Sequence, residues 1–350
     1  MRHDETDNTV RLKGPRAGER SFARFWPYAA GAVVLACLAA GGAFWSLRPA
    51  QAPAPAPIQA PAAVVQPARP APVAVAPVVP APAQPPLPRL ASEAEILADS
   101  PDRLALYRFG PYPAVVVLQF PSLAQQGQML NRVAALIEKQ GFPRDRVLPD
   151  AELQAAIIAS GATPDTFYYG HDYRSADLIR FFALAPDDVL NPEERRLRTL
   201  VTELGWREQG RLGALVSLVR ETAGPELDAA ARATILRHEL SHGVYFTEPA
   251  YAAYCLRFWN EVLTPPERAR FTAYLAKEGY DPAEADLIVN ETQAYLMHTR
   301  DRRFFNPTEL GLSAARVDEL RQLFVAGMPP GWLRDATAAT QNPLIPVRAQ

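Results

Sequence analysis

The chain has 350 residues, with 36 basic and 38 acidic side chains, so no overall field favours nucleic acid or an acidic partner. Its 35 prolines indicate that part of the length packs no hydrophobic core. The two cysteines, Cys37 and Cys255, lie far apart, which excludes a disulfide framework and disfavours a cysteine-based zinc site. A bound metal would therefore use imidazole and carboxylate.

The N-terminal region predicts a single membrane span. Residues 1–24 are polar and rich in basic side chains, whereas residues 25–47 carry no charge and have tryptophans near both ends. A bilayer core takes roughly 20 apolar residues in a helix, and a basic flank stays on the cytoplasmic side. We therefore expect a cytoplasmic tail, a transmembrane helix at 25–47 and an exported remainder. A cleaved signal peptide and a lipid-modified Cys37 are alternatives that export the same part.

Residues 48–89 form a segment of proline, alanine and valine. Proline fixes φ and removes a backbone donor, so a semi-rigid polyproline II linker is expected here. The segment resembles the spacers of envelope proteins in Gram-negative bacteria, which places the globular part in the periplasm.

An α/β subdomain is predicted for residues 90–205. The run PAVVVLQF (113–120) is typical of a buried strand, and Ser122 is placed to cap the helix that follows. Asn191, with proline and two glutamates behind it, marks another helix start. Beyond this subdomain, the run GALVSLVRE (213–221) predicts a further strand.

Residues 206–330 are predicted to be mainly helical, before a C-terminal tail at 331–350. Three sequences predict helix starts, namely Pro225-Glu226, Thr264-Pro265-Pro266-Glu267 and Asp281-Pro282-Ala283-Glu284.

The first of these helices carries RHELSHGVYF, residues 237–246. His238 and His242 are four residues apart, so both imidazoles lie on one helix face and can share an ion. Glu239 would reach a metal-bound water as general base. The histidines continue an apolar face begun by Leu227, Ala231 and Ile235. Gly243 is placed to end the helix after the second ligand.

A catalytic zinc takes three protein ligands and keeps one position open. Glu291, in the helix after Asp281, lies on the face marked by Ile288, Tyr295 and His298. Burying a carboxylate is costly unless it is paired or bound to metal. Glu291 is therefore the predicted third ligand.

HELSH followed by NETQAY resembles the gluzincin group of zinc metallopeptidases over roughly residues 225–300. The resemblance implies that His238, His242 and Glu291 bind zinc and that Glu239 is the base. Four residues after the glutamate, where the thermolysin branch has aspartate, this chain has Tyr295.

Gluzincins use a histidine or tyrosine to stabilise the oxyanion, and His298 is the favoured candidate. His171, Tyr245 and Tyr295 are alternatives, although His171 fits a loop histidine bonded to a neighbour. The strand at 213–221 suits either the edge strand that receives an extended substrate or a core strand. Tyr251, Tyr254 and Phe258 are predicted core residues.

The sequence thus predicts an α+β, zincin-like fold behind a membrane anchor, with residues 206–330 as the zincin-like metal-binding domain and Zn²⁺ as cofactor. The expected function is hydrolysis of amide bonds in proteins or peptides by a periplasmic zinc metallopeptidase held at the inner membrane. A cell-wall (peptidoglycan) amidase, and a binding or scaffold protein with a structural zinc or none, are the alternatives.

Overall fold

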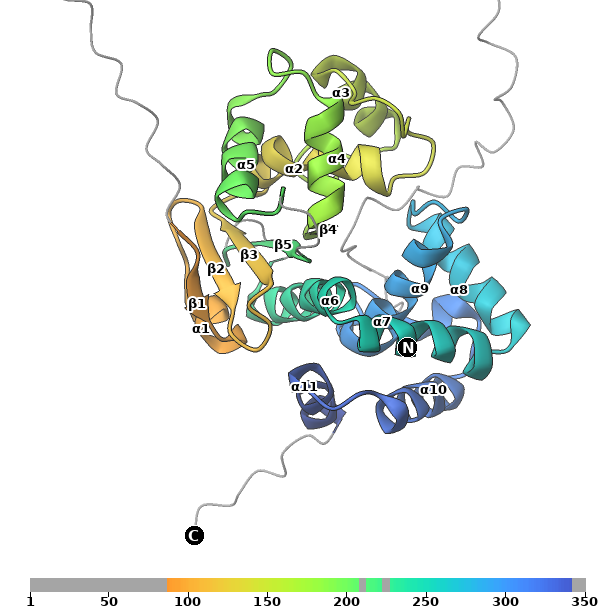
Figure 1. The fold of residues 1–350 in the computed structure, drawn as a ribbon. Coiled ribbons are helices and arrows are strands. Elements are labelled where there is room, and N and C mark those ends of the chain that lie inside the picture. The colour runs from red at the N-terminus through yellow and green to blue at the C-terminus, as the bar shows by residue number, and fades with distance from the viewer. Residues whose placement is uncertain (1–86, 208–211, 222–226, 342–350) are drawn as a thin grey trace, which may run out of the picture. The chain divides into compact units, whose positions relative to one another are not determined.

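The computed structural model describes residues 87–207, 212–221 and 227–341. They form an α+β fold that is mostly helical and contains a small mixed sheet (Figure 1). The predicted cytoplasmic tail, membrane span and proline-rich linker lie outside the described residues. Within the described ranges, no helix is both long enough and apolar enough to cross a bilayer.

The strands are β1 (Arg89–Ala91), β2 (Ala105–Phe109), β3 (Val115–Phe120), β4 (His171–Arg174) and β5 (Ala214–Val219). The α-helices are α1 (Glu93–Ala98), α2 (Leu123–Ile137), α3 (Asp150–Ala159), α4 (Ser175–Leu184), α5 (Pro192–Glu203), α6 (Ala229–Thr247), α7 (Pro249–Arg257), α8 (Pro265–Lys277), α9 (Ala285–Gln293), α10 (Ala314–Gly327) and α11 (Trp332–Gln341). Two π-helical turns, η1 (Phe258–Val262) and η2 (Ala294–His298), continue α7 and α9, and η3 (Pro307–Leu310) is a 3-10 helix.

The sheet has the strand order β1-β2-β3-β5-β4. The β1/β2 and β3/β5 pairs are parallel, and the β2/β3 and β4/β5 pairs are antiparallel. Helices α2 and α4 lie on one side of the sheet and α6 on the other (Figure 1). Every residue of β3 and β5 is buried, as expected for strands covered on both faces.

Two hydrophobic cores meet along α6. Ala231, Ile235 and Leu240 belong to the core around the sheet, whereas Val244 and Tyr245 belong to the core among the C-terminal helices. Along α6, His238 lies between Ile235 and Leu240 of the first core, and His242 lies where the first core gives way to the second. The predicted core residues Tyr251, Tyr254 and Phe258 are buried in the second core, as expected.

Three predicted helix starts are confirmed by their capping hydrogen bonds. Ser122 caps α2 by accepting from Gln125 N. Asn191 and Thr264 each form a reciprocal capping box at the start of α5 and α8. The polar side chain satisfies a backbone N–H that has no partner within the helix, which is why this signal is legible in sequence.

Two predicted starts and one predicted end are wrong. Helix α6 begins at Ala229, because Asp228 accepts from Ala231 N, and α9 begins only at Ala285. Asp281 instead accepts from Ala283 N within a turn. Gly243 does not end α6, which continues to Thr247. A Cβ at position 243 would lie 2.7 Å from Val115 Cγ1, so the glycine permits close helix–sheet packing.

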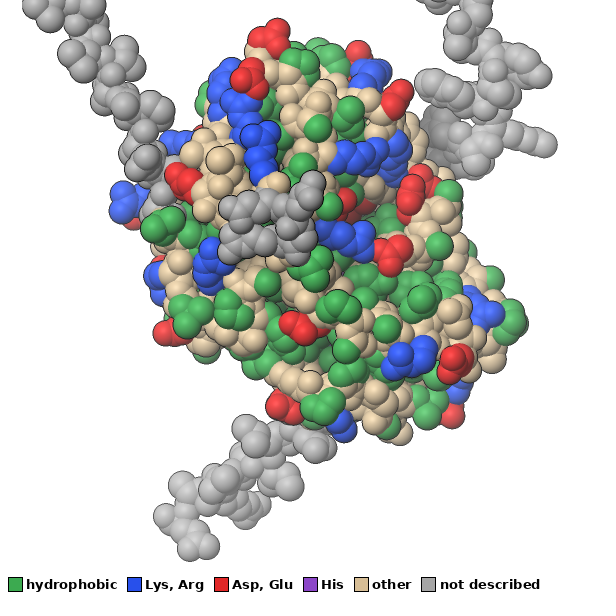
Figure 2. Space-filling model, viewed as in Figure 1, with side chains coloured by type: hydrophobic (Ala, Val, Ile, Leu, Met, Phe, Trp, Pro, Cys, Tyr) green, Lys and Arg blue, Asp and Glu red, His purple; other side chains and the backbone are tan. Residues whose placement is uncertain are grey.

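The predicted strand at 213–221 is confirmed as β5, and it is a core strand between β3 and β4. The edge position on that side is taken by β4, where a loop around His171 was predicted. At the C-terminus, residues 332–341 of the predicted tail form α11. Basic and acidic side chains are interspersed on the face in Figure 2, in keeping with the near-zero net charge.

Candidate metal centre

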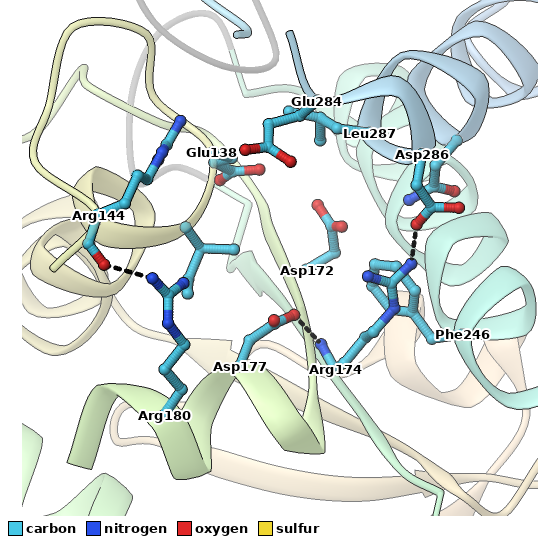
Figure 3. Close-up of a pocket in the computed structure, with 12 residues that line it drawn as sticks. Glu138, Arg144, Asp172, Arg174, Asp177, Arg180, Phe246, Glu284, Asp286 and Leu287 are labelled. Atoms are coloured by element: carbon cyan, nitrogen blue, oxygen red, sulfur yellow. Dashed lines mark hydrogen bonds and ion pairs between the residues drawn. The ribbon is translucent and has the colours of Figure 1, made fainter. Parts of the chain in front are cut away.

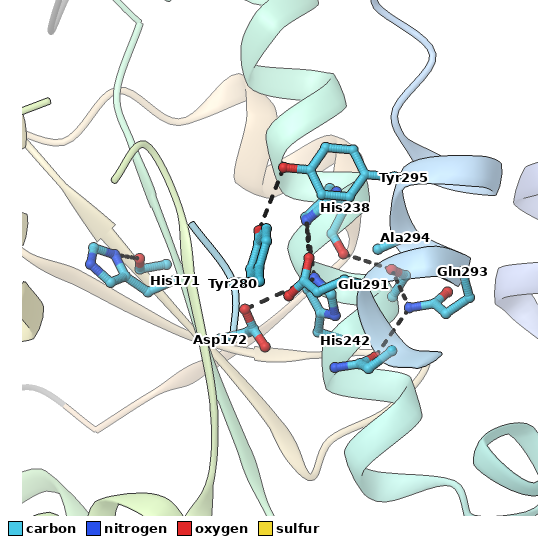
Figure 4. A network of polar contacts seen from close by, with 12 residues as sticks. His171, Asp172, His238, His242, Tyr280, Glu291, Gln293, Ala294 and Tyr295 are labelled. Atoms are coloured by element: carbon cyan, nitrogen blue, oxygen red, sulfur yellow. Dashed lines mark hydrogen bonds and ion pairs between the residues drawn. The ribbon is translucent and has the colours of Figure 1, made fainter. Parts of the chain in front are cut away.

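The structure brings together His238, His242 and Glu291, which we call the triad. The histidines come from α6 and the glutamate from α9 (Figure 4). The two Nε2 atoms are 3.0 Å apart, and they lie 3.8 and 3.7 Å from the Glu291 carboxylate oxygens. All three side chains are fully buried.

These distances fit a shared zinc ion. Bonds of about 2.0–2.1 Å around a tetrahedral zinc put the ligand atoms about 3.3 Å apart, and the triad distances of 3.0–3.8 Å bracket that value. Carboxylate oxygens at 3.7–3.8 Å are beyond hydrogen-bond range of the imidazoles. A buried cation between them would stabilise the carboxylate most directly.

Thr299 orients the first histidine. Its hydroxyl donates to the Ala294 carbonyl at 3.0 Å, so its lone pairs face His238 Nδ1 at 2.7 Å. Nδ1–H of His238 then donates to Thr299, which leaves the lone pair of Nε2 directed toward the triad. A hydrogen bond to the second ring nitrogen is the usual support of a metal-binding histidine.

A polar network fixes α9 against α6. Gln293 Nε2 donates to Ser241 Oγ at 3.1 Å, and Tyr251 of α7 donates to Gln293 Oε1 at 2.8 Å. Ser241 Oγ in turn donates to the His238 carbonyl. Ser241 lies within HELSH and Gln293 within NETQAY, so the two motifs contact each other beside the ligands.

Glu239, the predicted base, is fully buried next to the triad. Its carboxylate groups with His242 and Asp172, with one ligand atom from each lying within 4.8 Å of the others. A Cβ at Gly170 would lie 2.4 Å from Glu239 Oε1. The backbone at residue 170 therefore packs directly against the base, and only glycine fits there.

His298 is buried at the end of η2, with Nε2 3.4 Å from the Tyr251 hydroxyl. Burial lowers the pKa of His298 well below its usual value, and the charge on Arg237 lowers it further. A π-helical turn has more residues per turn than an α-helix, so η2 rotates His298 out of line with Glu291 and toward α7. Its oxyanion role stays a prediction.

The other oxyanion candidates occupy different surroundings. His171 is on β4, where Nδ1 is 3.1 Å from Ser217 Oγ on β5, on the strand face opposite Asp172. Tyr245 donates to Asp286 at 2.7 Å. The Tyr295 ring stands edge-on to His238 at 5.0 Å, and its hydroxyl is 3.5 Å from that of Tyr280. Of these, Tyr295 lies nearest to the triad.

A pocket of about 210 Å³ adjoins the site (Figure 3). Asp172, Glu138 and Phe246 line it. The Phe246 ring stacks on the His242 ring, with their centroids 6.4 Å apart. The Arg174 guanidinium lies 4.6 Å from the centre of the Phe246 ring and pairs with Asp286 at the rim. The pocket thus borders the neighbours of the triad, although no triad residue lines it.

Sequence reasoning missed Asp172 and Thr299. The residues YYGHDYRS drew attention to His171, although strand alternation sends His171 and Asp172 to opposite faces. Recognising 171–174 as a strand would have separated the two side chains, but not shown which face meets α6. Thr299 follows a π-turn that no residue pattern in the sequence indicated.

Comparison with models of known families, with curated proteins and with solved structures finds no match for this chain. We therefore infer the function from the geometry of the site and from the two short motifs. Neither the geometry nor the motifs assign the chain to a closer family.

Proposed function

We propose that this chain is a zinc-dependent hydrolase of the gluzincin type, a metallopeptidase that cleaves amide bonds. The observation that carries the proposal is the convergence of two histidines of α6 and one glutamate of α9 at distances of 3.0–3.8 Å. A zinc ion bound there would polarise an amide carbonyl and lower the pKa of water.

The chain's own residues supply the remaining chemistry. Glu239 is one residue from His238 and close to His242, where its carboxylate takes a proton from the attacking water and passes it to the leaving amine. Thr299 holds His238 in the ligand tautomer. Gln293 and Ser241 keep Glu291 facing the histidines.

The same proposal includes a place in the cell. The uncharged segment at 25–47 and the proline-rich segment at 48–89 support a domain tethered to the inner membrane and facing the periplasm. An enzyme in the periplasm meets amide bonds both in peptidoglycan and in proteins. Isolated cell wall and unfolded protein are therefore the two substrates to compare.

A second candidate is a non-catalytic protein with a structural zinc. The observation in its favour is burial, since Glu239 and all three triad residues have no exposed surface. A structural site has a full set of protein ligands and needs no access for water.

The test compares wild type with Glu239→Gln in the full-length chain purified in detergent. We expect one zinc per chain in both, measured by elemental analysis, with Glu239→Gln lowering the cleavage rate about 10²–10⁴-fold. Glu284→Gln, an exposed glutamate at the pocket, is the control and should keep full activity.

His242→Ala should lose the zinc. Cleavage of wall material but not of unfolded protein would identify an amidase. Zinc retained by wild type and Glu239→Gln, without cleavage by either, would favour the structural site, and a zinc-free wild type would refute both candidates.

A further inference from the structure

The proposed function leaves one question about the fourth position at the metal. Hydrolysis needs a water between the ion and Glu239, yet His242 and Glu239 are 0% exposed. Beside His242 and Glu239 lies the carboxylate of Asp172, which belongs to neither motif. The inference below depends on the proposed function.

Asp172 approaches two of the three triad residues, His242 and Glu291. Its Oδ2 is 3.9 Å from His242 Nε2, close to the 3.7 Å between His242 Nε2 and Glu291 Oε1. It also groups with Glu291 and Glu138 within 4.8 Å, as it does with His242 and Glu239. The Asp172 carboxylate therefore lies beside two triad residues, His242 and Glu291, and beside the base Glu239.

Strand β4 holds Asp172 in this place. Asp172 pairs with Val216 of β5, and Arg174, two residues further on the same strand face, is anchored by Asp286. On the opposite face, His171 contacts Ser217. Gly170 packs against Glu239, so the strand covers the base while it presents the aspartate.

We propose that Asp172 is a fourth protein ligand of the same ion, and that it closes the site in this conformation. With the Asp172 carboxylate turned away from His242, water and substrate would gain access to the site. The displacement is feasible because β4 is an edge strand with a single neighbour, so its movement leaves the β3/β5 pairing intact. The pocket in Figure 3 borders Asp172 and provides room for the released carboxylate or for substrate.

The proposal predicts two effects of opposite sign in Asp172→Ala. Loss of a ligand should weaken zinc binding at least about tenfold, measured by competition with a chelator. At saturating zinc, acetohydroxamate, a small zinc-binding probe, should bind at least about tenfold more tightly, because a site that is open a tenth of the time binds about tenfold more weakly. General damage to the fold would weaken both interactions.

Asp172→Asn, of the same shape, provides a second variant if the alanine variant folds poorly. Asp177→Asn is the matched control, because this aspartate lines the same pocket without belonging to any group of candidate ligands among the described residues. In the Co²⁺-substituted chain, wild type and Asp177→Asn should share one visible spectrum, and both Asp172 variants should differ from it.

Unchanged zinc affinity together with unchanged hydroxamate affinity in both Asp172 variants would overturn the fourth-ligand proposal while leaving the triad intact. A wild-type chain that binds no zinc, or whose zinc binding survives His242→Ala, would refute the proposed function itself. Faster cleavage by Asp172→Ala, abolished in Asp172→Ala/Glu239→Gln, would support both.

Discussion

The chain contains two buried polar clusters that are built differently. In one, the Arg132 guanidinium donates to both carboxylate oxygens of Glu194, with Nε to Oε1 at 2.7 Å. Its remaining donors reach the carbonyls of Leu148 and Val189. In the other, imidazoles and carboxylates of the triad face one another at 3.0–3.8 Å beside a pocket.

The difference separates a structural pair from a candidate ligand site. Arg132 and Glu194 balance each other's charge at hydrogen-bond distance, and Glu194 also caps α5 through Asn191 N. The triad brings lone pairs together at the spacing of a coordination sphere. In the first cluster, the buried charges of Arg132 and Glu194 balance each other. In the second, under the proposed function, a bound cation would balance the buried carboxylate.

Breaking the Arg132–Glu194 pair should have the largest effect on the free energy of unfolding. Glu194→Ala should lower the free energy of unfolding by about 3–5 kcal/mol, because it leaves a buried guanidinium with only the largely exposed Asp150 carboxylate, 3.4 Å away, as its ionic partner. Glu193→Ala is the control, since its pair with Arg196 at 3.3 Å is at the surface and should contribute less than about 1 kcal/mol. Urea titration measures both, and similar losses in the two variants would contradict the distinction.

The less deeply buried pair of Arg316 and Glu267 extends the comparison to the pH dependence of stability. The hydrogen bond from Arg316 lowers the pKa of Glu267 from 4.5 to about 2. A carboxyl whose pKa is depressed on folding stabilises the fold above its unfolded pKa, and this contribution is lost as pH falls from 4.5 through 2. Glu267→Gln should therefore cost roughly 2 kcal/mol at pH 6.

The cost of Glu267→Gln should shrink steadily below pH 4.5 in unfolding experiments. Glu319→Gln is the control, because Glu319 contacts the same Arg316 at 2.8 Å with its side chain 58% exposed. Its effect should stay below about 1 kcal/mol. A Glu267→Gln cost that is constant between pH 6 and 3 would show that the charge of Glu267 is not the source.

The smallest expected effect concerns the support of the triad. Thr299→Val removes the acceptor for His238 Nδ1–H and should weaken zinc binding about tenfold, or about 1.4 kcal/mol. Thr292→Val is the matched control, because the buried Thr292 hydroxyl has no hydrogen-bond partner in the described part of the chain. Equal zinc affinities of the two variants by chelator competition would rule out the tautomer argument.

Local signals in the sequence were sufficient for several elements of the fold. Ser122, Asn191 and Thr264 act through backbone groups three residues away, so their capping role is visible without the tertiary structure. The order of the strands was not predictable in this way. Placing β5 between β3 and β4 depends on pairing across a long sequence separation, which no local pattern encodes.

The same distinction applies to the site. His238 and His242 share a helix face through their spacing alone, and Glu291 was inferred from its position on an apolar face. Asp172 reaches them only because β4 lies beside α6 at the edge of the sheet. Its part in the site depends on which strand face meets the helix, and four residues of alternating pattern do not specify that.

The triad joins segments that are far apart in the chain, and Asp172 would add a third. An ion held jointly by β4, α6 and α9 would close a loop from residue 172 to residue 291, as a disulfide does when it limits the freedom of the unfolded chain. The one cysteine in the described residues, Cys255, is buried and unpaired. Bound metal would then restrict the unfolded chain as a disulfide does, and the described residues contain no disulfide.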